Sequence, residues 1–247
     1  MKIGAFIIHL ARAEGRRAHV EALRAALPMP AEIVDAVDGA LLSEAEKAAV
    51  YHPKLHRPRY PFALSSSEIG CFLSHRKAWR ALLDSDLDAA LVLEDDAGLA
   101  MRTLATGLDL ARAAMGSGVL VRFPNRLHGD RGPVIASRSE SVLLAPGRVG
   151  LGMVAFMLDR RAAELLLDLT ARFDRPVDTF LQMRWRHGVA IRAVRPSGVT
   201  EVSDRLGGTT VQRRRPGGGS KLGRNMKRAV YRMQVALHSA MRVNPPR

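Results

Sequence analysis

Short apolar runs alternate with longer amphipathic segments along most of the chain. A short, partly β-branched apolar run is typical of a buried strand, whereas apolar positions three or four residues apart are typical of a helix. The strands predicted in this way are 2–9, 32–37, 89–93, 119–123, 153–158 and 189–194. The predicted helices are 13–26, 43–50, a segment capped by Ser66 or Ser67 that runs to Leu83, 101–115, a segment capped by Asp159 that runs to Leu169, and 177–185. This alternation favours an α/β fold with a mostly parallel sheet flanked by helices.

The pattern changes after residue 204. Glycine pairs and a Pro-Gly-Gly-Gly run predict a flexible linker over 205–220. In the last segment, 221–247, apolar residues recur every three or four positions among basic ones. These apolar residues are Leu222, Met226, Val230, Met233, Leu237 and Met241. The sequence therefore predicts a main domain over 1–204, a linker, and a basic amphipathic helical tail.

Charge is distributed as unevenly as the apolar pattern. The chain of 247 residues has a net charge of +14, from 38 Lys and Arg against 24 Asp and Glu. From Arg205 onward there are 11 basic residues and no acidic one, which leaves 27 against 24 before it. A nearly neutral body with a cationic tail predicts contact with phosphates, on a membrane surface or on a nucleic acid.

Other features bear on the compartment. The single cysteine, Cys71, excludes an internal disulfide, and the first apolar run is too short for a signal-peptide core. No uncharged stretch approaches the ~20 residues that a spanning helix needs. We therefore expect a cytoplasmic protein whose membrane contact, at the inner face, is peripheral.

An acidic triplet, Glu94-Asp95-Asp96, ends the strand predicted at 89–93. Ligands of open α/β sheets bind beyond the carboxyl ends of strands, and carboxylates suit Mg²⁺ or Mn²⁺ bridging a diphosphate. Glu94 and Asp96 alternate along an extended chain, so both could face one ion with Asp95 on the other side. A solvated acidic turn accounts for the local pattern equally well.

The helix predicted after Ser67 carries an unusual set of residues. Glu68 and His75 lie seven positions apart, hence on one helical face, and Gly70 permits close approach of a backbone or a ligand. Both are catalytic candidates. Alternatively, Glu68 supports the helix N-terminus and His75 is a core histidine. Cys71 is interpreted as a small core residue rather than a nucleophile.

Three further residues have both a functional and a structural interpretation. Arg12 and Arg16 lie one turn apart after the first strand, where guanidinium groups could bind nucleotide phosphates or could form a solvated helix face. Asp178 lies at a predicted helix start. It could be a general base, or an acid that stabilises the helix N-terminus.

Taken in order, these segments resemble glycosyltransferase family 25, the lipooligosaccharide galactosyltransferase-like family. The blocks that carry the resemblance are 7–12 with Arg16, 35–39, 67–75 and 91–97, and weaker ones at 152–160 and 176–178. The resemblance implies a GT-A-like fold and a nucleoside-diphosphate sugar donor, with UDP-galactose as the expected one. It further implies inverting transfer of a hexose to a hydroxyl of a lipooligosaccharide, a lipopolysaccharide or another surface glycan, lipid-linked or free.

The resemblance also implies roles for individual residues. Glu94 and Asp96 would hold Mn²⁺ or Mg²⁺, and Asp178 is the candidate base opposite the leaving group. The donor would be contacted by His9, Arg12, Arg16, Asp38, Glu94 and Asp95. His9 stands where the family usually has Asn, which leaves the base selectivity or the donor geometry open.

Two other classes of function remain as hypotheses. In a nucleic-acid-binding protein the basic tail would be the electrostatic footprint, but aromatic residues are only 5% of the chain and the tail has only Tyr231. A degenerate transferase scaffold, binding sugar or membrane without turnover, is the other. An anionic membrane surface is the expected partner of the tail, since each Lys or Arg near it contributes about 1 kcal/mol.

Overall fold

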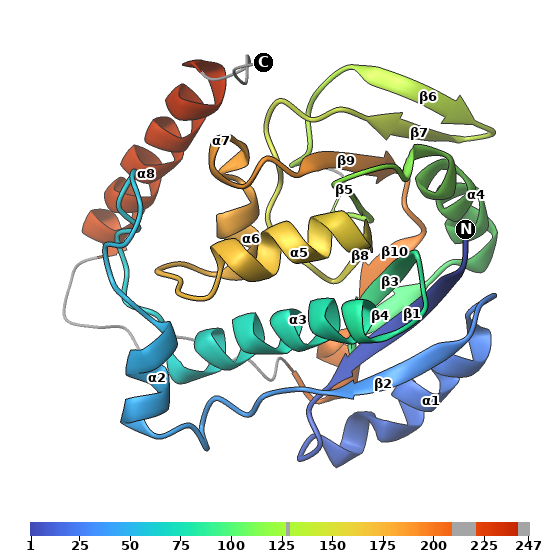
Figure 1. The fold of residues 1–247 in the computed structure, drawn as a ribbon, viewed down its shortest axis with the longest axis horizontal. Helices are drawn as coiled ribbons and strands as arrows, with labels where there is room; N and C mark the ends of the chain where they lie inside the picture. Colours follow the sequence, from blue (N-terminus) through green and yellow to red (C-terminus); the bar gives the residue numbers. More distant parts are fainter. Residues whose placement is uncertain (127–128, 209–220, 242–247) are drawn as a thin grey trace.

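The computed structural model describes residues 1–126, 129–208 and 221–241, and its centre is an eight-stranded sheet (Figure 1). The order of the strands in the sheet is β2-β1-β3-β8-β5-β9-β7-β6. Their bounds are β1 (Ile3–His9), β2 (Ala31–Asp35), β3 (Ala89–Glu94), β5 (Val119–Arg122), β6 (Val134–Arg138), β7 (Ser141–Leu144), β8 (Ala155–Asp159) and β9 (Ala190–Arg195). Two short strands, β4 (Ala97–Leu99) and β10 (Val199–Glu201), form a separate antiparallel pair.

Six of the eight strands run in the same direction. Strands β2, β1 and β3 are mutually parallel, and β5 is parallel to β9. Strand β8 is antiparallel to both of its neighbours, β3 and β5, and so restores the common direction across the sheet. Strand β7 is antiparallel to β9 and β6. The predicted α/β fold with a mostly parallel sheet is confirmed.

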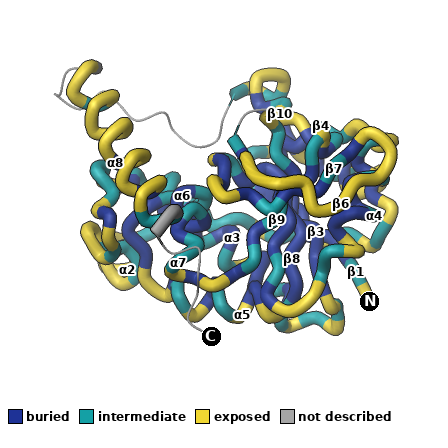
Figure 2. Tube along the Cα trace, turned by 90° about the horizontal axis from the view of Figure 1, so that it is seen from above, coloured by how far each residue is buried: buried dark blue, intermediate teal, exposed yellow. Residues whose placement is uncertain are grey.

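Helices cover both faces of the sheet, and strand residues alternate between two apolar layers. Phe6 and Ile8 of β1 point into the layer beneath α3 (Ser66–Asp84), α5 (Arg160–Leu169) and α6 (Val177–Leu181). Ala5 and Ile7 point into the opposite layer, beneath α1 (Arg17–Ala26) and α4 (Met101–Ala114). Because successive side chains of a strand face opposite sides, a strand buried on both faces is apolar throughout, which is the pattern read from the sequence. Figure 2 shows the strands as the buried centre of the molecule.

Several element boundaries differ from the sequence-based prediction. The helix predicted at 177–185 is two short helices, α6 and α7 (Arg184–His187). The N-cap of α3 is Ser65 rather than Ser66 or Ser67, because Glu68 lies at the third helical position and closes a capping box with Ser65. The helix predicted at 13–26 begins as a 3₁₀ turn, η1 (Glu14–Arg16). Asp159 does cap α5, as predicted.

Four strands were not predicted at all. The hairpin strand β6 is exposed along its whole length, although it begins with the apolar residues Val134 and Ile135, and it shows no alternation of apolar and polar positions. Its partner β7 and the three-residue strands β4 and β10 are too short to give a pattern.

The remaining helices lie at the periphery. They are α2 (Glu44–Val50), η2 (Ser203–Leu206) and α8 (Lys221–Met241). Helix α8 is the tail helix expected from the sequence. Of the linker predicted at 205–220, residues 209–220 lie outside the described residues, and the division into domain, linker and tail stays a prediction. Within the described parts of the chain, no helix combines the length and hydrophobicity that crossing a bilayer requires.

Candidate functional site

A cavity of about 470 Å³ lies at the edge of the sheet where β1, β2 and β3 end. Residues that follow these strands form one side of it, and the first turns of α3 and α6 and the segment before β8 form the other. Its size is that of a site for a small organic ligand. The carboxyl ends of parallel strands meet at one edge of a sheet, which is why residues far apart in the sequence converge here.

The cavity wall is strongly acidic. The described carboxylates that line it are Asp38, Glu68, Glu94, Asp95, Asp96, Asp178 and Glu201. Against these seven, the described lining contains two arginines, Arg12 and Arg126. A negatively charged ligand such as a diphosphate would be repelled unless a cation entered with it.

Asp96 shows most directly that the wall is suited to a cation. Its side-chain oxygen Oδ1 is buried, and no described residue forms a hydrogen bond with it. Burial of the carboxyl, followed by the nearby charge of Glu94, raises the pKa of Asp96 to about 7, although Arg16 opposes this. An unpartnered buried oxygen beside a second carboxylate is what a hard divalent cation would bind. The residues present therefore fit the predicted metal.

Two residues that do not line the cavity bind the side chain of Asp95. His9 Nδ1 donates to Asp95 Oδ2 at 2.9 Å, and Arg16 Nη1 forms an ion pair with Asp95 Oδ1. His9 and Arg16 are only 1% and 2% exposed. Both side chains contact the acidic triplet and neither is in the cavity lining, so their predicted contact with the nucleotide stays a prediction. The unusual histidine at position 9 positions Asp95.

Glu94, His75 and Cys71 form a cluster on the wall. His75 Nε2 donates to Glu94 Oε1 at 3.2 Å, while its Nδ1 is buried with no partner among the described residues. Cys71, His75 and Glu94 each place a potential ligand atom within 4.8 Å of the others. Burial, then the charge of Glu94, raises the pKa of the Cys71 thiol well above its usual range. The raised pKa disfavours the thiolate at neutral pH, and the predicted core position is corrected, since Cys71 is half-buried on the cavity wall.

The loop after β2 is packed directly against α3. Ser74 Oγ accepts a hydrogen bond from Val37 N at 2.8 Å and donates one to Gly70 O at 2.7 Å. A Cβ added at Gly70 would lie 2.6 Å from Gly39 N and from Val37 O, so the backbones touch. The close approach predicted for Gly70 is thus confirmed, and its partner is the backbone of the loop.

This contact fixes the positions of Asp38 and Glu68, two carboxylates that line the cavity. Arg12 Nε donates to Asp38 Oδ2 at 2.5 Å. A hydrogen bond from Ala40 N, and then the one from Arg12, lowers the pKa of Asp38. Glu68 serves the helix N-terminus, since its Oε2 accepts from Ser65 N at 2.8 Å, and it also lines the cavity.

Asp178 reaches the cavity from the opposite part of the chain. It lies in the first turn of α6, where Oδ2 accepts a hydrogen bond from Gly152 N at 3.0 Å and Oδ1 accepts one from Thr179 Oγ1 at 3.1 Å. The segment that precedes β8 therefore aims the carboxylate. Its position on the wall agrees with either of its two predicted roles.

Three lining residues were missed by the sequence analysis. Asn125 and Arg126 follow β5, and Asn125 Nδ2 donates to Glu201 Oε2 at 2.9 Å. Asn125 and Arg126 could have been predicted as site residues, because they follow the carboxyl end of a predicted strand. Nothing local marks Glu201, which is brought to the cavity by the pairing of β10 with β4.

Comparison with known proteins identifies a family for the part of the chain that supplies the acidic triplet. A family model described as glycosyltransferase family 25 (LPS biosynthesis protein) matches residues 2–113. Procollagen galactosyltransferase 2 of Homo sapiens is 36% identical over 94 residues. Residues 2–113 belong to glycosyltransferase family 25. The stretch shared with the human protein is 37% of this chain and 15% of that protein.

The family 25 region carries Arg12, Asp38, the block 67–75 and the acidic triplet, whereas Asp178 lies outside it. Inactive glycosyltransferase 25 family member 3 of Mus musculus is 34% identical over 94 residues, 37% of this chain and 16% of that protein. Among solved structures, the galactosyltransferase LgtC in complex with donor and acceptor sugar analogues has a TM-score of 0.36 and 12% identity, over 76% of this chain and 72% of that one.

Proposed function

We propose that the cavity binds a nucleoside-diphosphate sugar together with a divalent cation and transfers the glycosyl group to an acceptor hydroxyl. The observation that carries this proposal is the buried, unpartnered oxygen of Asp96 beside Glu94, in an acidic cavity at the strand ends. Membership of family 25 over the region that builds this wall supports the same reaction class.

In this proposal Glu94 and Asp96 hold the Mn²⁺ or Mg²⁺ ion. The ion would neutralise the charge that develops on the departing diphosphate. His9 and Arg16, by fixing Asp95, keep the triplet in place when the cation is absent. Arg12, paired with Asp38 at the mouth, is the positive group best placed to meet the anionic donor.

Asp178 is proposed as the general base. As the acceptor oxygen attacks the anomeric carbon, the bond from that carbon to the diphosphate oxygen breaks and the diphosphate leaves with the electron pair. The acceptor proton passes to the Asp178 carboxylate, and attack from the face opposite the leaving group inverts the anomeric centre. The hydrogen bonds from Gly152 N and Thr179 Oγ1 support this role, because they hold the carboxylate in a fixed orientation on the cavity wall.

The donor sugar and the acceptor are proposed only from the similarity of this chain to known proteins. The matched relatives named procollagen galactosyltransferase favour a hexose, with galactose from UDP-galactose first to be tried. The family description, LPS biosynthesis protein, favours a lipooligosaccharide or lipopolysaccharide acceptor, which would place the enzyme at the cytoplasmic face of the membrane.

The test is a panel of nucleotide sugars incubated with the protein, with and without Mn²⁺, followed by calorimetry of the best donor. We expect cation-dependent hydrolysis or transfer with one nucleotide sugar, and loss of cation-dependent donor binding in Asp96→Ala. Asp204→Ala is the matched control, because Asp204 is an exposed acid outside the cavity lining.

Unchanged donor affinity in Asp96→Ala would defeat the metal assignment. Donor binding without any turnover would instead favour a sugar-binding scaffold, an outcome that the relative named as inactive makes worth measuring.

A further inference from the structure

Helix α8 exposes an apolar stripe to solvent. Exposed fractions along it are 75% for Leu222, 60% for Met226, 41% for Val230, 57% for Met233 and 53% for Leu237. At about 100° of turn per residue, these five side chains fall within an arc of about 80°. Figure 2 shows the helix projecting from the body with most of its surface exposed. A contiguous exposed apolar strip of this kind marks an interaction surface.

The opposite face of α8 attaches the helix to the body. Tyr231 and Val235 are 6% and 7% exposed, and by the same helical geometry they lie about 140° to 180° from the middle of the stripe. Tyr231 Oη accepts a hydrogen bond from Arg175 Nη1 at 2.8 Å, and its ring packs edge-on against Tyr60 with centroids 5.4 Å apart. The direction in which the stripe faces is therefore set by buried contacts.

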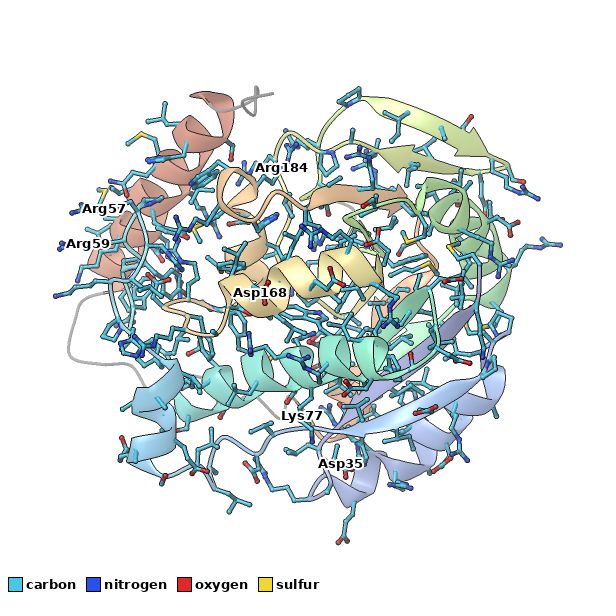
Figure 3. All side chains as sticks on the ribbon, viewed as in Figure 1. Asp35, Arg57, Arg59, Lys77, Asp168 and Arg184 are labelled. Atoms are coloured by element: carbon cyan, nitrogen blue, oxygen red, sulfur yellow. The ribbon has the colours of Figure 1, made fainter. Side chains whose placement is uncertain are left out.

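Basic residues lie on both sides of the stripe, and α8 contains no acidic residue. The sequence of α8 contains five Lys or Arg residues and no Asp or Glu. Lys227 and Arg232 are exposed and lie on either side of the stripe, about 100° to 120° from its middle. Two more exposed arginines, Arg57 and Arg59, lie beside α8 on the loop that Arg175 also contacts through Pro58 O at 2.9 Å (Figure 3).

We propose that the stripe of α8, together with Lys227, Arg232 and the exposed Arg57 and Arg59 of the neighbouring loop, docks on an anionic lipid bilayer. Apolar residues in the centre with Lys and Arg at the flanks are the arrangement of a helix that lies in the plane of a membrane interface. The cations would meet lipid phosphates while the Leu, Met and Val side chains enter the acyl boundary.

The same features disfavour the other occupants. A second copy docked through this face would bring Lys227 and Arg232 of both helices together with no acid from either helix, which is unfavourable. A single-stranded nucleic acid is bound by aromatic side chains on which bases stack, and the stripe is aliphatic. The bilayer alone uses both the apolar centre and the charged flanks.

The test is cosedimentation of the full chain with vesicles of neutral phosphatidylcholine and with vesicles that also contain phosphatidylglycerol. We expect binding to the anionic vesicles that weakens with salt. The double variant Met226→Gln, Met233→Gln should reduce partitioning at least tenfold, because it removes two inserted side chains from the centre of the stripe. Substitution of Arg57 and Arg59 by Gln should reduce partitioning less and flatten the salt dependence.

The matched control is Val134→Gln, Ile135→Gln, which removes two equally exposed apolar side chains from β6 and should leave vesicle binding unchanged. All substituted positions are exposed, and circular dichroism checks that the variants fold. Undiminished vesicle binding by the α8 variant overturns the proposal. So does a dimer, or binding to an oligonucleotide, that the same variant abolishes while vesicles are not bound. The readout involves no glycosyl transfer, so its failure and that of the proposed function are separate.

Discussion

The acidic triplet shows how three adjacent carboxylates can coexist inside a protein fold. Asp95 forms an ion pair with Arg16 and accepts a hydrogen bond from His9, and Glu94 accepts one from His75. Asp96 is left with a distant ion pair to Arg16, at 3.4 Å, and a buried oxygen with no described partner. The unfavourable electrostatics is therefore concentrated on one side chain, which holds a proton near neutral pH in the absence of a cation.

This gives a prediction for stability against pH. The pKa of Asp96 is about 7 in the folded protein against 3.8 as the reference, so the folded state binds the proton more tightly. The stability of the metal-free protein should thus fall as the pH rises from about 4 to about 7. Asp96→Asn should raise the free energy of unfolding at pH 8 by on the order of 2 kcal/mol, and by little at pH 4.5. Urea denaturation with a chelator measures both; an equal gain at the two pH values would contradict the assignment.

Asp178 gives a second prediction at this scale. If it is the base, Asp178→Asn should lower kcat about 10²-fold or more and leave the KM for the donor nearly unchanged. Asn keeps the shape and can still accept from Gly152 N, so the fold should be retained. Steady-state kinetics with a soluble acceptor gives the result. A loss confined to KM would instead make Asp178 a binding residue.

At the scale of elements, the decisive contact is between α3 and the loop that follows β2. The two blocks of sequence, 35–39 and 67–75, interlock through Ser74 and through two glycines. A Cβ on Gly39 would lie 1.8 Å from Ser66 O, so neither glycine has room for a side chain. Because Asp38 and Glu68 lie on the two sides of this contact, it sets the width of the cavity at its mouth.

Gly70→Ala should therefore damage both stability and donor binding. The added methyl would meet backbone atoms of Val37 and Gly39 at 2.6 Å, and backbone cannot move aside as a flexible side chain can. We expect a loss of about 3 kcal/mol in the free energy of unfolding and weaker donor binding. Gly15→Ala is the control, since a Cβ there meets nothing within 4 Å. Denaturation and calorimetry give the two values, and a fully stable Gly70→Ala with normal donor affinity would refute the interlock.

At the scale of the whole molecule, α8 is joined to the site region through one buried arginine. Arg175 is fully buried and contacts Asp174, Tyr231 and Pro58. It is followed in the chain by Pro176 and Val177, which line the cavity. Deleting the tail after Gly219 would remove both the exposed stripe and Tyr231, the hydrogen-bond acceptor of the buried Arg175. Surface substitutions therefore separate membrane binding from protein stability more clearly than a truncation does.

Tyr231→Phe tests the anchor. Loss of the hydroxyl leaves the buried Nη1 of Arg175 with only the weak acceptor Met183 Sδ, which should cost about 1–2 kcal/mol in the free energy of unfolding. Met233→Gln, on the opposite face of α8, should change stability by less than about 0.5 kcal/mol. Chemical denaturation of both variants decides the matter, and equal stabilities would show that Tyr231 does not fix the helix.

Most strands and helices of the body, the place of the acidic triplet at a strand end, the cap at Asp159 and the tail helix could be predicted from the sequence alone. Each of these depends on residues within a few positions of one another, through side-chain periodicity and local hydrogen bonds. The hairpin of β6 and β7 was missed, because its strands are short and do not alternate regularly between apolar and polar residues.

What each of these features contacts could be seen only in the folded chain. There, His9 and Arg16 bind Asp95, Asp178 and Glu201 reach the same cavity wall as the acidic triplet, and Tyr231 and Val235 pack α8 against the body. The tail's periodicity marks an apolar stripe, yet the body packs against the opposite side. Such pairings join segments far apart in sequence, and they are fixed by the shape and charge of the surfaces that meet, which no local pattern encodes.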